Sequence, residues 1–125
     1  MLAVLRLVLA SAAILAAGHA RAVELTLARM PVAHEEVWLE ITLGALPRGA
    51  QLRIDAPDGT LIETISPFGV RAGESAGTYR VALPQNLVAQ GKVRVDLAVL
   101  GDGPVHSPTS DEVDSVRLIY VPVTR

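Results

Sequence analysis

Apolar and polar residues alternate one by one along most of this chain, and this period of two is the feature that most constrains its fold. Successive side chains of a β-strand point to opposite faces, so alternation predicts a strand with one buried face. The clearest case is residues 36–43, where Val37, Leu39, Ile41 and Leu43 alternate with polar residues and Trp38. Alternating stretches occur at residues 23–28, 36–43, 52–55, 60–65, 78–83, 93–99 and 115–123. They predict about seven short strands.

Turn-forming residues separate the predicted strands. Pro57-Asp58-Gly59 joins two of them as a hairpin, because proline presets φ and glycine permits positive φ. Residues 66–77 and 101–114 are longer polar connections, and residues 84–91 have room for one helical turn only. The pattern predicts an all-β fold: a single antiparallel β-sandwich over residues 23–125, with a small barrel as the alternative.

The first 22 residues have the order of parts of a cleaved secretory signal peptide. Arg6 provides an amino-terminal charge, Leu7–Ala17 is an unbroken apolar run, and Ala20 and Ala22 are small residues at a cleavage site. The run is shorter than the roughly 20 residues that span a bilayer, so we expect no stable membrane anchor after cleavage. Cleavage before Val23 is favoured over cleavage after Ala20. These features predict a periplasmic or secreted protein.

Composition narrows the possible functions. The segment from Val23 onward has all 13 acidic residues and 9 of the 11 basic ones, hence a net charge of −4 with histidine neutral. An acidic domain is a poor general ligand for nucleic acid, which binds basic surfaces. The chain has no cysteine, which excludes disulfides, cysteine-bound metals and thiol nucleophiles.

Three segments resemble strands of bacterial immunoglobulin-like or fibronectin type III-like modules. They are VWLEITL at residues 37–43, IDAPDGTLIETI at residues 54–65, and AGTYRVALP at residues 76–84. The resemblance implies a β-sandwich that binds, scaffolds or assembles rather than one that catalyses. Fold alone does not determine function, so the function must be inferred from individual side chains.

Catalytic patterns are weak in this sequence. None of the serines after residue 23 lies in a G-x-S-x-G motif. Glu36 and Glu40 share a strand face but lie roughly 13 Å apart by strand rise, too far for the paired carboxylates of a glycosidase. We therefore expect neither an enzyme nor a cofactor.

Four apolar residues are candidates for contact with a partner. Trp38 falls on the polar face of its strand, Phe68 lies in a long loop, and Ile119 and Val121 form a second apolar face on the last strand. A strand that is apolar on both faces is either central or covered by something else. Alternatively, Trp38 packs against an arginine of a neighbouring strand, and Phe68 closes one end of the sandwich. These residues predict an exported, non-enzymatic binding or accessory module that contacts another protein or a second copy of itself.

A small periplasmic metal-binding protein is the alternative function. Cleavage after Gly18 would make His19 the amino terminus, whose amine and imidazole could chelate copper together with His34 or His106. The loop at residues 101–114 could instead bind calcium through oxygen ligands. Its candidate ligands are Asp102, Asp111, Asp114, Glu112 and His106.

Overall fold

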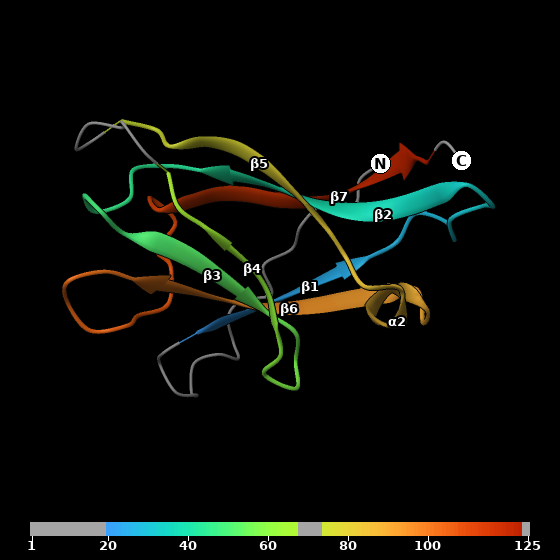
Figure 1. The fold of residues 1–125 in the computed structure, drawn as a ribbon, viewed down its shortest axis with the longest axis horizontal. Coiled ribbons are helices and arrows are strands. Elements are labelled where there is room, and N and C mark those ends of the chain that lie inside the picture. Colours follow the sequence, from blue (N-terminus) through green and yellow to red (C-terminus); the bar gives the residue numbers. More distant parts are fainter. Residues whose placement is uncertain (1–19, 68–73, 124–125) are drawn as a thin grey trace.

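Two antiparallel sheets face each other in the computed structural model of the chain, which describes residues 20–67 and 74–123 (Figure 1). The four-stranded sheet has the order β1 (Arg21–Thr26), β6 (Lys92–Leu100), β3 (Gln51–Asp55), β4 (Leu61–Ile65). The three-stranded sheet has the order β5 (Gly77–Ala82), β2 (Glu35–Leu43), β7 (Val113–Pro122). The strands of the described residues do not close into one barrel, so the prediction of a β-sandwich is confirmed over its alternative.

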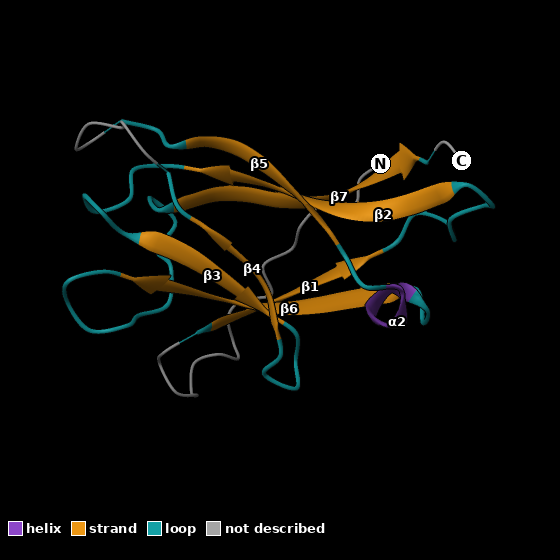
Figure 2. Ribbon diagram, viewed as in Figure 1, coloured by secondary structure: helices purple, strands orange, loops and turns teal. Residues whose placement is uncertain are grey.

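The predicted strands are present, with ends that differ by about two residues from those expected. The single helical turn is also present as α2 (Gln85–Val88), between β5 and β6 (Figure 2). No helix in the described part of the chain is long and apolar enough to cross a membrane.

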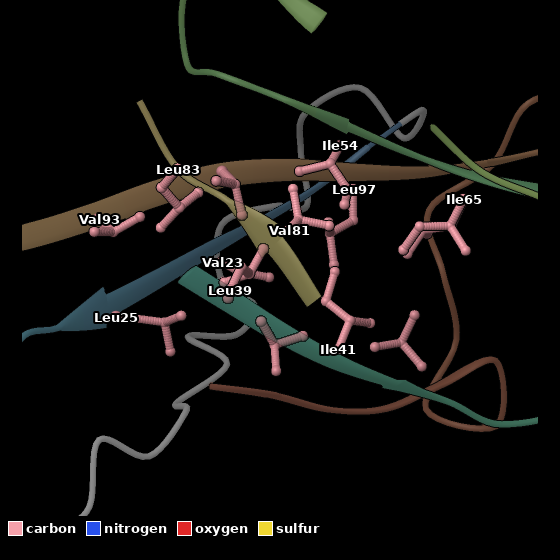
Figure 3. Packing of buried hydrophobic residues seen from close by; sticks show 14 of the residues in the cluster. Val23, Leu25, Leu39, Ile41, Ile54, Ile65, Val81, Leu83, Val93 and Leu97 are labelled. Atoms are coloured by element: carbon pink, nitrogen blue, oxygen red, sulfur yellow. The ribbon is translucent and has the colours of Figure 1, made fainter. Parts of the chain in front are cut away.

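The core lies between the two sheets and consists almost entirely of valine, leucine and isoleucine (Figure 3). Leu39 and Ile41 of β2 are fully buried, as are Ile54 of β3 and Val95 of β6. Each occupies an inward-facing position of its alternating strand. Burial of such a side chain stabilises the fold by roughly 1.5–3 kcal/mol. The inward-facing apolar residues of the alternating strands are therefore the main source of stability.

Strand β7 lies at the edge of its sheet and pairs with β2 alone among the described strands. Of the two explanations for its two apolar faces, a central position is therefore wrong. Its inward-facing Val116 and Leu118 belong to the core, whereas Ile119 and Val121 point to the opposite, outer side of the sheet.

Strand β1 begins at Arg21, which lies opposite Leu97 of β6, and Ala22 lies opposite Asp96. Cleavage after Ala20 would leave this strand complete, whereas cleavage before Val23 would remove its first two residues. The rest of the predicted signal peptide, including His19, lies outside the described residues.

Candidate functional site

Three of the predicted contact residues lie together on the outer face of the three-stranded sheet. Trp38 of β2 lies directly opposite Ile119 of β7, and the neighbouring outward position of β7 is Val121. These three side chains are half-buried, and Ala82, opposite Trp38 on the β5 side, is exposed. We call these four residues the Trp38 patch. The fourth predicted contact residue, Phe68, lies outside the described residues.

A hydrogen bond within β2 orients the indole of Trp38. Its Nε1 donates to Oε1 of Glu36 at 3.1 Å. In the described part of the chain, the guanidinium that lies over an aromatic ring is that of Arg29, 4.1 Å from the centroid of Tyr120. No guanidinium of the described residues lies over the Trp38 ring, whereas packing of an arginine side-chain stem beside the indole stays a prediction. The indole N–H is satisfied, which leaves an apolar ring for contact.

A buried carboxylate borders the Trp38 patch. Glu40 of β2 lies opposite Arg80 of β5 and Arg117 of β7. Its oxygens accept hydrogen bonds from the Nε of Arg117 at 2.5 Å and the Nε of Arg80 at 3.1 Å. The bond from Arg117 is the main reason that the Glu40 pKa lies below its ordinary value, although burial acts in the opposite direction. One carboxylate between two arginines leaves an excess of positive charge on the Glu40 side of the patch, and the Glu36 carboxylate lies on its other side.

The outward arginines of the other sheet pair differently. Arg53 bonds Asp55 at 2.9 Å, and Arg94 lies 4.0 Å from Asp96, each within its own strand. Cross-strand ion pairs are formed instead by Arg80 and Arg117, both with Glu40. The outer face of the four-stranded sheet is therefore charged where that of the three-stranded sheet has its apolar patch.

A network that the sequence did not suggest ties the β1–β2 loop to the end of β7. The Arg29 guanidinium donates to both carboxylate oxygens of Glu35, at 2.7 and 2.8 Å. The Tyr120 hydroxyl donates to the Arg29 carbonyl at 2.5 Å. Arg29 and Tyr120 are 91 positions apart, so no local pattern could have predicted this contact. It fixes the end of the outer face next to Val121.

We predict that this network makes the free energy of unfolding depend on pH in the acidic range. The hydrogen bond from Arg29 is the main cause that lowers the Glu35 pKa from 4.5 to about 2. A carboxylate with a lowered pKa stabilises the folded state above its unfolded pKa, and the contribution disappears as pH falls through the folded pKa. The difference in unfolding free energy between wild type and Glu35→Gln should be largest at neutral pH. It should shrink as pH falls from about 4.5 to about 2, in urea melts at a series of pH values.

The matched control is Glu35→Gln in an Arg29→Gln background. There the pH dependence should be much smaller, because the guanidinium that is the main cause of the lowered pKa is gone and only the Val32 N–H bond at 3.1 Å remains. An undiminished pH dependence in the Arg29→Gln background would contradict the assignment.

In the polar loop at residues 101–112, the histidine contacts an acidic residue of the same loop. His106 Nε2 lies 3.0 Å from Oε2 of Glu112, whose Oε1 accepts the Thr109 N–H at 2.9 Å. The backbone of His106 also bridges to Val99. Asp111 and the other predicted calcium ligands are not gathered around this pair: among the described residues, no group of three or more such side chains lies close enough to hold a metal ion.

The His106 contact predicts a pH dependence of opposite sign to that of Glu35. The hydrogen bond to Glu112 is the main cause that raises the His106 pKa above its ordinary value of 6.5. A raised pKa stabilises the fold fully below the unfolded pKa, and the gain is lost as pH rises through the folded pKa. His106→Gln should therefore cost more stability at pH 5 than at pH 8.5 in thermal melts. In a Glu112→Gln background the difference between the two costs should be much smaller, with only the contact to the Pro104 carbonyl at 3.3 Å left to raise the pKa; an undiminished difference would contradict the role of Glu112.

Comparisons with known proteins add no relative: no family model, no curated protein and no solved structure matches the chain. The outer face of the three-stranded sheet is the arrangement that brings predicted contact residues together.

Proposed function

We propose that this chain is an exported, non-enzymatic binding or accessory module that contacts another protein chain through the outer face of its three-stranded sheet. The observation that carries the proposal is the Trp38 patch. Trp38 and Ile119 lie 81 positions apart in the sequence, yet they occupy opposite positions of one strand pair.

The chemistry of this face suits contact with protein. Tryptophan and arginine are over-represented among residues that dominate binding energy, especially where an apolar centre is surrounded by polar groups. Here the indole and Ile119 form the apolar centre, and Arg80 and Arg117 lie beside it on either side of Glu40. A partner with an apolar side chain next to an acidic group would complement this surface.

The strand pairing shares two strand pairs with immunoglobulin-like modules, and it differs from them in the positions of β1, β4 and β7. Such sandwiches pair their second strand with the fifth and their third with the sixth, as β2–β5 and β3–β6 do here. In those modules the first strand lies beside the second and the last beside the sixth. In this chain β1 lies beside β6 and β7 beside β2, so the terminal strands have exchanged sheets, and β4 lies beside β3 instead of beside the fifth strand. The exchange puts Ile119 and Val121 beside Trp38.

Photo-crosslinking in cells tests the proposal. The chain is expressed with its own amino-terminal segment, and a photoreactive benzoylphenylalanine replaces Ile119 in one variant and Arg94 in the other. Arg94 is exposed on the outer face of the opposite sheet and serves as the matched control position. After irradiation, the extracytoplasmic fraction is separated and probed for adducts of the chain.

The expected result is a processed, exported chain that forms a discrete protein adduct from position 119 and none from position 94. The adduct should decrease strongly when Trp38→Ala is added to the position-119 variant. Retention of the chain in the cytoplasm, or identical adducts from both positions, would contradict the proposal.

A further inference from the structure

The edge of β7 carries unpaired backbone groups that can be assigned residue by residue. The N–H of Val123 donates to the carbonyl of His34, which directly precedes β2, so the backbone of Val123 points toward β2. From there β2 and β7 pair without a register shift as far as Thr42 and Ser115. Backbone groups alternate between the two sides of a strand. The N–H and C=O groups of Val116, Leu118 and Tyr120 therefore point away from β2, toward a side where no described strand pairs.

The same assignment follows from the other side of the sheet. Leu83 N–H donates to the Val37 carbonyl, so the odd-numbered residues of β2 bond to β5 and the even-numbered ones bond to β7. Trp38 and Glu40 are thus hydrogen-bonded to Ile119 and Arg117 across the strand pair. The even-numbered residues of β7 remain for the free edge.

Strand β7 differs from the other three edge strands in its greater length and in the uncharged stretch at its carboxyl-terminal end, although Arg117 lies near its centre. Strands β1, β4 and β5 have five or six residues each, with Glu24, Glu63 or Arg80 at or near their centres. Strand β7 has ten residues, and its last five, from Leu118 to Pro122, carry no charge. Short length and central charges are what natural sheets use to prevent edge-to-edge pairing. The edge of β7 is suited to pairing with another strand.

We propose that β7 pairs antiparallel with β7 of a second copy of this chain, with Leu118 on the twofold axis, so that the two three-stranded sheets become one six-stranded sheet. In this register Val116 faces the partner's Tyr120, and Leu118 faces the partner's Leu118. The N–H and C=O groups of all three residues then find partners. Pro122, which has no N–H, and the irregular pairing near Val113 fall at the two ends of the paired segment.

Charge and backbone hydrogen bonding favour a second copy as the occupant. With Leu118 on the axis, the outward Arg117 faces the partner's Ile119, and Ser115 faces the partner's Val121, so no like charges oppose each other. Moving the axis to Arg117 would oppose two arginines, a destabilising arrangement. Moving it to Ile119 would oppose Val116 to the partner's Pro122, which cannot donate. Of these three registers, the one with Leu118 on the axis satisfies both hydrogen bonding and charge.

This inference rests on the proposed function, because it names the partner of the same sheet. It also adds a contact to the Trp38 patch: the partner's Arg117 would lie beside Ile119 at the end of the row that contains Trp38.

Disulfide crosslinking tests the register directly, since the natural chain has no cysteine. In the proposed pairing Ser115 and the partner's Val121 form a non-hydrogen-bonded pair, with Cα atoms about 4.5 Å apart, close enough for a disulfide. Within one chain the same two positions lie roughly 20 Å apart along the strand and cannot join. Mild oxidation of the Ser115→Cys/Val121→Cys variant should give a covalent dimer on a non-reducing gel. Ile119→Cys alone should stay monomeric on the same gel.

Two substitutions of opposite charge at position 119 distinguish pairing through the edge of β7 from contact through the outer face of the sheet. Ile119→Lys would oppose the partner's Arg117 and should abolish the dimer in native mass spectrometry and light scattering. Ile119→Glu would oppose the same arginine with an acid and should retain or strengthen the dimer. Circular dichroism and thermal melts verify that both variants fold like wild type.

Each outcome decides the matter. A dimer of wild type, a crosslink in the double-cysteine variant and survival of only the Ile119→Glu dimer support the proposal. A monomeric wild type without a crosslink overturns it, and a crosslink in Ile119→Cys alone overturns the register. If Ile119→Lys and Ile119→Glu abolish the dimer equally, pairing through the edge of β7 is overturned, while the proposed binding through the Trp38 patch stands. If Trp38→Ala also leaves the position-119 adduct described above unchanged, the proposed function fails as well.

Discussion

Leu39→Ala is expected to lower the free energy of unfolding by about 2–5 kcal/mol, a large share of the stability of a small domain. Leu39 is 0% exposed at the middle of β2, opposite Val81 on one side and Leu118 on the other. Removal of its side chain leaves a cavity between well-packed strands, and the loss of buried area adds to the cost of the cavity. Urea or guanidinium melts of the purified protein measure the effect.

The same substitution at an exposed leucine is the control. Leu61 of β4 is 51% exposed, so Leu61→Ala should change the unfolding free energy by no more than about 0.5 kcal/mol. Equal losses at the two positions would mean that the core does not lie where the structure places it.

Gly44→Ala should also be severely destabilising, by at least the roughly 1–3 kcal/mol typical of overpacked sites. A Cβ at Gly44 would overlap the backbone oxygen of Asp111, which a side-chain rotation cannot relieve. The backbone there is fully engaged: Gly44 donates to Glu112 at 2.9 Å and accepts from Ala76 at 3.0 Å. The turn that contains Asp111 would have to move away from the end of β2, at the expense of these bonds.

Gly103→Ala is the matched control, since a Cβ at Gly103 meets no atom within 4 Å and its φ is not positive. Thermal melts should show a marked drop for Gly44→Ala and little change for Gly103→Ala. A Gly44→Ala variant as stable as wild type would show that the end of β2 and the 109–112 turn are not in close contact.

The sequence predicted the layers of this fold because alternation is a local property. Each of Leu39, Ile41 and Val95 faces inward for a reason that can be read within its own strand, and the core follows from their sum. Trp38, Ile119 and Val121 could be recognised individually in the same way, as apolar residues on the wrong face of a strand. That they form one patch depended on β7 lying beside β2, which alternation does not encode.

Long-range polar contacts could not be predicted from the sequence for a related reason. The bond of Tyr120 to Arg29 and the position of Glu40 between Arg80 and Arg117 depend on strand order and register. Any of the outward arginines could have paired with any acid on the same sheet, and local pattern offers no means of choosing. The pairing of Glu40 with two arginines emerges only when β5 and β7 are placed on its two sides.

Native mass spectrometry of the protein purified from the extracytoplasmic fraction of cells that express the full chain, with copper and calcium added, tests the proposed protein-contact function. We expect a chain that begins at Arg21 or Val23 and is associated with another chain, without a retained metal ion. A chain that keeps its first 18 residues or more and stays in the cytoplasm would contradict export. A monomer at every concentration that begins at His19 and holds one copper ion, or holds one calcium ion, would contradict the claim that this is a protein-contact module.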